Sequence, residues 1–193
     1  ILNLDLAEGK AVDADKAFRK VLESDPENLV ATLGIAAAAG SQGNPKEAEK
    51  WLQKAATDHP ESVEAQLALV QFYLGSGEFR KALTVTDAAA KAAPKSAAVS
   101  NARGFAQLGL KQMPEAIASF KLATEQEPKA YGYALNLARA HFLNEDVKGS
   151  LDVLNGVLKA EPGFLPALAL AAAVSLKAGD VEKAAGYVAR LKQ

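Results

Sequence analysis

Apolar residues recur at steps of three and four along most of the chain, which is the period of an amphipathic helix. Val63, Leu67, Val70 and Leu74 follow these steps. No stretch of the sequence shows the alternation of apolar and polar positions that is typical of a half-buried strand. We therefore expect an all-α protein.

Several residue types return every 34 residues without an insertion. The prolines of this register are Pro26, Pro60, Pro94, Pro128 and Pro162. A small residue recurs at the same interval, at Ala14, Ala48, Ala82, Ala116, Ser150 and Ala184. A bulkier residue follows it by four positions, at Phe18, Leu52, Thr86, Phe120, Leu154 and Val188. Small residues let two helices cross closely and a proline cannot continue a helix, so each period predicts a helix, a turn, a second helix and a stop.

Turn and cap residues fall where this scheme needs them. A glycine register, suited to a left-handed helix end, contains Gly9, Gly43, Gly77 and Gly179 and is interrupted by Lys111 and Glu145. Four residues are placed to cap the next helix, namely Asn28, Asn44, Ser62 and Ser96. The turns are therefore predicted between hairpin helices of nearly constant length.

This 34-residue hairpin, with its small, bulky and proline positions, resembles the tetratricopeptide repeat. The resemblance covers the whole chain and implies a right-handed superhelical solenoid of helix-turn-helix hairpins with about eleven helices. It implies a single array over 1–193, made of a partial repeat 1–28 and repeats 29–62, 63–96, 97–130, 131–164 and 165–193. The first helices depart from the family's pattern, since only Tyr73 fills its tyrosine position, but residue size is kept at the close contacts.

In this family the first helix of each repeat lines a concave groove, so the resemblance implies which residues meet a partner. We expect the peptide- or partner-binding groove to include Leu67, Gln71, Asn101, Phe105, Asn136, Arg139 and Phe142. Further inner positions in the same frame include Leu33, Ala37 and Leu135. An apolar surface with a few amides suits an extended or helical peptide. The alternative for each residue is packing between neighbouring repeats.

Family members that hold the C-terminal carboxylate of chaperones use lysines on the inner helices, and the compared positions here supply none. We therefore do not expect such a clamp. Arg139 with Asn136 can still take a single acidic or carbonyl group. The alternative for Arg139 is an ordinary solvated or salt-bridged surface arginine.

Composition narrows the possible partners. Lys plus Arg total 22 against 23 for Asp plus Glu, so the net charge of −1 favours neither nucleic acid nor an anionic membrane. The absence of Cys excludes disulfides, thiolate nucleophiles and cysteine-based metal sites. The longest apolar run, 164–176, is shorter than the roughly 20 residues of a membrane-spanning helix. We expect no direct membrane insertion by this segment.

Catalytic patterns are missing from the sequence. Its two histidines, His59 and His141, are not spaced to hold a metal on one helix face, and His141 is expected to pack between helices. The glycines are spread one to a turn and are not grouped into a phosphate-binding loop. We therefore expect no catalytic residues, no metal and no cofactor.

These observations favour a non-catalytic scaffold or adaptor that binds a protein or peptide. The phrases 46–52 and 161–168 are also similar to the repeat region of bacterial PEP-CTERM-system TPR lipoproteins. That resemblance implies exopolysaccharide-associated protein sorting at the cell envelope, on the periplasmic side, with a lipid anchor upstream; a cytoplasmic location is the alternative. The alternative function is a structural spacer or oligomerisation segment of a larger envelope or secretion protein, and a catalytic domain elsewhere in a longer chain is a third.

Both ends of the sequence are apolar. The chain opens with Ile1, Leu2, Leu4 and Leu6, and its last helix carries Val181, Tyr187, Val188 and Leu191 without a polar helix after it. Solenoids need polar caps for solubility. We therefore expect a fragment of a longer chain, or self-association through the uncapped ends.

Overall fold

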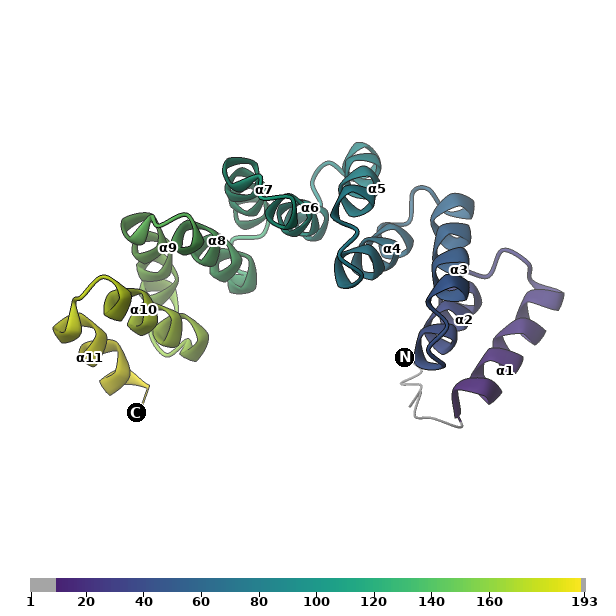
Figure 1. Ribbon diagram of the computed structural model, residues 1–193, viewed down its shortest axis with the longest axis horizontal. Helices are drawn as coiled ribbons and strands as arrows, with labels where there is room; N and C mark the ends of the chain where they lie inside the picture. The colour runs from purple at the N-terminus through teal and green to yellow at the C-terminus, as the bar shows by residue number, and fades with distance from the viewer. Residues whose placement is uncertain (1–9, 192–193) are drawn as a thin grey trace. The chain divides into compact units, whose positions relative to one another are not determined.

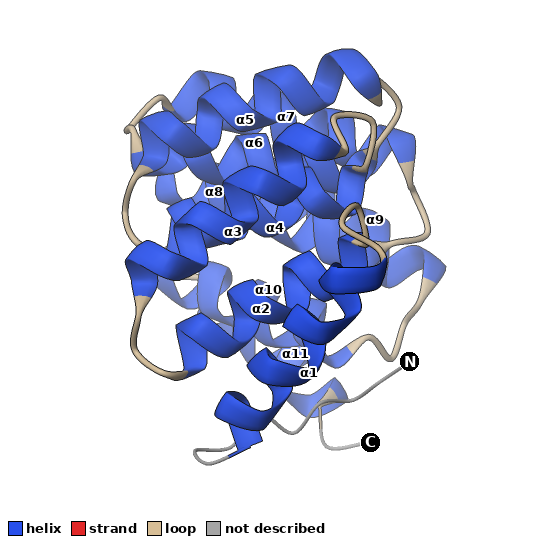
Figure 2. Ribbon diagram, turned by 90° about the vertical axis from the view of Figure 1, so that its right-hand side faces the viewer, coloured by secondary structure: helices blue, strands red, loops and turns tan. Residues whose placement is uncertain are grey.

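The computed structural model describes residues 10–191, which form helices joined by short turns (Figures 1 and 2). The helices are α1 (Lys10–Ser24), α2 (Leu29–Ser41), α3 (Pro45–Asp58), α4 (Val63–Gly75), α5 (Phe79–Ala92), α6 (Ala97–Gly109), α7 (Met113–Gln126), α8 (Tyr131–Leu143), α9 (Val147–Ala160), α10 (Leu165–Lys177) and α11 (Val181–Arg190). Residues 10–191 contain no strand. The predicted all-α class and the predicted hairpin order are confirmed.

Side-chain caps begin the helices that the sequence marks. The side-chain oxygens of Asn28, Ser62 and Ser96 accept hydrogen bonds from backbone N–H groups three residues later, at 2.8, 3.2 and 3.4 Å. Asn44 caps α3 in the same way, and Pro45 stands at the first helical position. A proline is tolerated there because the first N–H groups of a helix have no partner within the helix.

The turn inside each complete hairpin has a left-handed residue at one register. Gly43, Gly77 and Gly179 have φ of 70°, 72° and 79°, and Lys111 and Glu145 adopt φ of 60° at the same position. In all five turns the next residue's N–H bonds the carbonyl five residues earlier. This is the Schellman closure of a helix end, so the turn geometry is kept even where the glycine is absent.

The small and bulky registers make the helix crossings. Ala82 and Ala116 are fully buried, and Phe120 and Leu154 are at most 1 % exposed. A Cβ built on Gly104 of α6 would lie 2.7 Å from the Phe120 ring, so the first helix of this repeat approaches the ring with its bare backbone. The small register and four bulky positions, Leu52, Thr86, Phe120 and Leu154, are therefore buried packing positions, as predicted, whereas Val188 of α11 is 39 % exposed.

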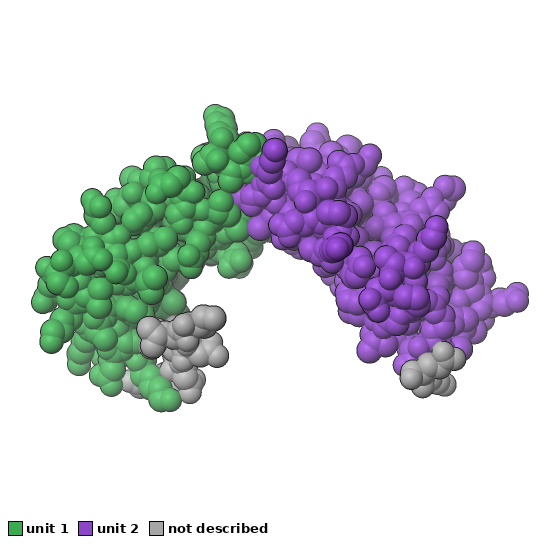
Figure 3. All heavy atoms as spheres, turned by 180° about the vertical axis from the view of Figure 1, so that it is seen from behind, with its two compact units in different colours: residues 1–94 green, residues 95–193 purple. Residues whose placement is uncertain are grey.

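The helices form two compact units, 1–94 and 95–193, coloured separately in Figure 3. Within each unit every helix packs against the next in sequence, and first helices also contact one another, as in α2–α4, α6–α8 and α8–α10. The boundary falls after Pro94, a member of the proline register. Sequential packing of this kind is typical of a repeat solenoid. The single array over 1–193 stays a prediction.

The chain ends bear on two other expectations. Ile1, Leu2, Leu4 and Leu6 lie outside the described residues. On α11, Tyr187 is buried, whereas Val181 is 66 % exposed. Self-association through the ends stays a prediction. None of the helices within 10–191 combines the length and the apolarity that a membrane crossing requires.

Candidate partner-binding surface

The first helices of unit 1 line a pocket of about 590 Å³ together with α3. Four of the predicted inner residues belong to its wall, namely Leu33, Ala37, Leu67 and Gln71. Leu67 is half-buried and Gln71 is exposed. The pocket therefore offers apolar walls with an amide at its edge, which suits an apolar side chain of a partner.

The other seven wall residues of this pocket were not predicted for the groove, and two of them, Phe72 and Glu64, change its chemistry. Phe72 adds an aromatic ring, and Glu64 adds a carboxylate near the start of α4. The repeat frame gave Phe72 no role; it follows Gln71 by one position, which turns a helical side chain by about 100°. A half-buried aromatic ring can pack and line a pocket at once, so the frame alone does not separate the two roles.

In unit 2, three predicted groove residues form a chain of hydrogen bonds across α6 and α8. Asn136 Nδ2 donates to Asn101 Oδ1 at 2.8 Å, and Arg139 Nη1 donates to Asn136 Oδ1 at 3.4 Å. Asn101 and Asn136 are half-buried, and Arg139 is exposed. The sequence predicted each of these residues for the groove but did not predict that they bond to one another.

Phe105 and Phe142 differ in how much surface they offer. Phe105 is 38 % exposed and meets the buried Phe120 edge to face, with ring centroids 5.1 Å apart. Phe142 is half-buried and packs against the core cluster of α8, α9 and α10. Leu135 is only 7 % exposed, so its expected place on the exposed inner surface is wrong. Its side chain belongs to that same core cluster.

A polar cluster braces unit 1 away from the pocket. Glu49 Oε1 of α3 accepts from Lys81 Nζ of α5 at 3.0 Å and from the Tyr73 hydroxyl of α4 at 3.0 Å. These two hydrogen bonds, that of Lys81 first, lower the pKa of Glu49 below its ordinary value. Lys81 also lies 5.0 Å from the centroid of the Tyr73 ring. The cluster joins three helices of successive repeats and has a structural role.

Both histidines lie within hydrogen-bond distance of other residues of the fold. His59 Nε2 lies 2.8 Å from the Glu27 carbonyl oxygen. His141 Nδ1 lies 2.9 Å from Asp146, whose other carboxylate oxygen caps α9 by accepting from the Gly149 N–H. The described residues hold no group of three or more His, Cys, Asp or Glu side chains arranged to bind a metal ion.

Comparison with solved structures finds the same architecture in bacterial proteins. PilW, described as a widely conserved type IV pilus biogenesis factor, has a TM-score of 0.78 at 20% identity, over 95% of this chain and 85% of PilW. A tetratricopeptide repeat protein of Parabacteroides merdae has a TM-score of 0.76 at 18% identity, over 95% and 73%. YrrB, described as a TPR protein with an unusual peptide-binding site, has a TM-score of 0.65 at 18% identity, over 92% and 91%. A search of curated proteins finds no match.

Family profiles agree with the repeat frame. Two overlapping matches to one tetratricopeptide repeat profile cover residues 5–58 and 41–104, which is more than half of the chain. A second profile of the same name matches residues 114–163. Both profiles describe repeats of the kind that typically serve protein–protein interaction without catalysis. With its period, its hairpin geometry and these matches in agreement, the chain belongs to the tetratricopeptide repeat family.

Proposed function

We propose that this protein is a non-catalytic scaffold that binds a peptide segment or a partner protein on its first helices. The observation that carries the proposal is the surface of those helices. In unit 1 they line an apolar pocket, and in unit 2 they present an exposed aromatic ring beside a hydrogen-bonding chain. Apolar pockets give a peptide its side-chain contacts, and polar groups beside them fix its orientation.

The residues of this surface that we assign to binding are Leu67, Gln71, Asn101, Phe105, Asn136, Arg139 and Phe142. We expect the more exposed of these residues to contribute more to partner binding. Gln71, Phe105 and Arg139 are exposed, so their loss removes contacts with a partner. Phe142 and Leu67 are half-buried and also support packing, so their substitution tests binding and folding together.

Two of the similar structures support the class of function. YrrB is described as having a peptide-binding site, and PilW as a factor in pilus biogenesis. Identities of 18% and 20% relate these proteins to this chain by fold. They carry no partner over to this chain, so the partner has to be found by experiment.

A pull-down from separated cell fractions tests the proposal. The bait is the wild-type chain, beside a Gln71→Arg/Arg139→Glu variant and an Arg80→Glu control. Arg80 is exposed on α5, a second helix, so the control changes charge away from the proposed surface. We expect a protein that wild type and control retain and the double variant loses. Equal retention by all three baits would favour a spacer or oligomerisation segment over a groove adaptor.

From the sequence phrases alone we further propose a role in exopolysaccharide-associated protein sorting at the bacterial envelope, on the periplasmic side, with a lipid anchor upstream. The proposal rests on the resemblance of these phrases, in repeats that are rich in alanine, to the lipoprotein repeat region. The same fractions test it. A groove-dependent partner found in the periplasmic or membrane fraction supports the envelope, and one found only in the cytosolic fraction contradicts it.

A further inference from the structure

The proposed binding surface has an uneven distribution of charge. The whole chain has 23 Asp and Glu residues. The first helices of unit 2, α6, α8 and α10, contain none of them, and the two first helices of unit 1 contain one, Glu64. Apart from Glu64, the carboxylates within residues 10–191 therefore lie on second helices and turns. The net charge of the whole chain is −1, but the first helices of unit 2 carry no negative side chain.

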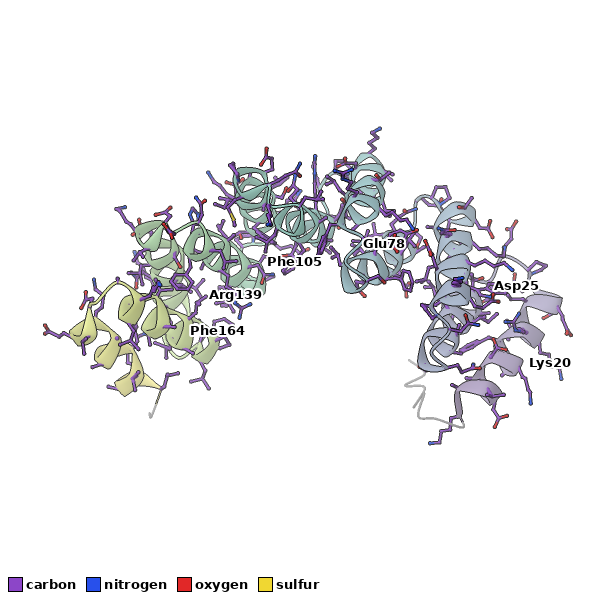
Figure 4. The ribbon with its side chains drawn as sticks, in the orientation of Figure 1. Lys20, Asp25, Glu78, Phe105, Arg139 and Phe164 are labelled. Atoms are coloured by element: carbon purple, nitrogen blue, oxygen red, sulfur yellow. The ribbon has the colours of Figure 1, made fainter. Side chains whose placement is uncertain are left out.

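Arg139 is the exposed cation of this surface on α8. Among the described residues it has no carboxylate partner, and its hydrogen bond to Asn136 is long, at 3.4 Å. A guanidinium has five N–H donors, so most of its capacity is turned to the solvent. Arg139 and Phe105 project on the same side of unit 2 (Figure 4). Lys177, at the end of α10, adds a second exposed cation to the first helices.

The hydrogen-bond chain leaves donors unused. Both amide oxygens accept, that of Asn101 from Asn136 and that of Asn136 from Arg139. The amide nitrogen of Asn101 donates a hydrogen bond to none of the described residues. An amide nitrogen carries two N–H groups, so both are unused. Beside Phe105, the chain therefore presents N–H groups to a partner. Groups that accept hydrogen bonds, such as carboxylates and the backbone carbonyls of an extended chain, complement it.

We infer that unit 2 binds an extended peptide segment with an internal Asp or Glu near an aromatic or branched apolar residue, the carboxylate on Arg139 and the apolar side chain on Phe105. An extended segment suits the unused amide donor because a helical one would satisfy its own carbonyls. The inference rests on the proposed function and names the partner chemistry of the same surface.

The geometry also sets the spacing of the two peptide residues. Phe105 and Arg139 lie one period apart, on α6 and α8, first helices of neighbouring repeats that touch each other. Axes of packed helices lie about 8–10 Å apart. An extended chain advances about 3.3 Å per residue. The acidic residue is therefore expected roughly two or three positions from the apolar one.

Selection from a displayed library of short random peptides tests the inference. The baits are wild type, Arg139→Gln and the control Arg80→Gln, which removes the same charge from α5. We expect wild type and control to enrich peptides with Asp or Glu two or three positions from an aromatic or branched residue. Arg139→Gln should lose the acidic preference and keep the apolar one, since Phe105 is unchanged.

Affinity then measures the contact itself. For the most enriched acidic peptide, changing its Asp or Glu to the amide should weaken binding to wild type about 10- to 100-fold, the effect of a hydrogen bond to a charged group. The same peptide change should have almost no effect with Arg139→Gln. An equal loss with both proteins would place the carboxylate elsewhere and overturn the inference.

The selection separates this inference from the proposed function. Peptides that lack an acidic preference, and bind Phe105→Leu more weakly than wild type, would overturn the acidic partner and leave the scaffold in place. If no peptide is enriched by wild type over a bare support, the inference falls and the peptide-binding form of the proposed function falls with it.

Discussion

Lys111 and Glu145 occupy the left-handed turn position that Gly43, Gly77 and Gly179 hold in the other hairpins. A residue with a Cβ loses about 1–2 kcal/mol in this conformation. Glycine avoids that loss but gives up about 0.5–1 kcal/mol of chain entropy on folding. The Lys111 and Glu145 side chains are exposed and bond no other described residue, so removing them forfeits no contact. Lys111→Gly and Glu145→Gly should each stabilise the fold by about 0.5–1 kcal/mol.

Urea unfolding followed by circular dichroism measures the change, with two reverse substitutions as controls. Gly77→Ala should destabilise the fold by about 1 kcal/mol. A Cβ there meets nothing within 4 Å, so the loss is conformational and not steric. Gly75→Ala, at the end of α4 with equally open surroundings, should be neutral or stabilising because its φ is not left-handed. If Lys111→Gly destabilised the protein as Gly77→Ala does, the turn argument would be refuted.

Three further substitutions test the packing and the electrostatics. Gly104→Ala should destabilise the protein by about 1–3 kcal/mol in thermal or urea unfolding, because its Cβ would enter the buried Phe120 ring, whereas Gly132→Ala has open space and should not. Ala82→Leu, at a fully buried crossing, should also destabilise by about 1–3 kcal/mol; an unchanged midpoint would mean that α4 and α5 do not cross tightly there. The lowered pKa of Glu49 implies stability that is complete above its unfolded pKa and is lost as pH falls through the folded value. Between about pH 5 and pH 3 the wild type should therefore lose more stability than Glu49→Gln, and parallel pH profiles would contradict the role of the Lys81 and Tyr73 contacts.

The sequence predicted the fold because each repeated residue has one mechanical use. Ala116 can only be a close crossing in its register, and Asn28 can only be a cap beside the helix that it begins. The prediction is also insensitive to local exceptions. Lys111 and Glu145 break the glycine register, yet the Schellman hydrogen bonds of their turns are kept. A period of 34 residues averages over such departures.

The binding surface was harder to predict than the fold. A side chain at an inner position of a first helix can be either exposed or buried. Leu135 shares a helix with Asn136 and Arg139, but it is buried in the core of unit 2. Phe105 is exposed and also packs on Phe120. The hydrogen bond between Asn101 and Asn136 joins residues 35 positions apart, one more than the period, so the register did not pair them. Exposure and side-chain bonding depend on the neighbouring repeat, which a single repeat's pattern does not contain.

Photo-crosslinking in the source cells tests most directly whether partners meet the first helices. A photoreactive amino acid replaces exposed Gln71 on α4 in one variant and exposed Arg80 on α5 in another. Both side chains are exposed and belong to unit 1. A difference in crosslinking between the two positions therefore reports which surface the partner covers. The account predicts a discrete protein adduct at position 71 and none at position 80. Adducts at position 80 alone, or the same adducts at both positions, would contradict a binding surface on the first helices.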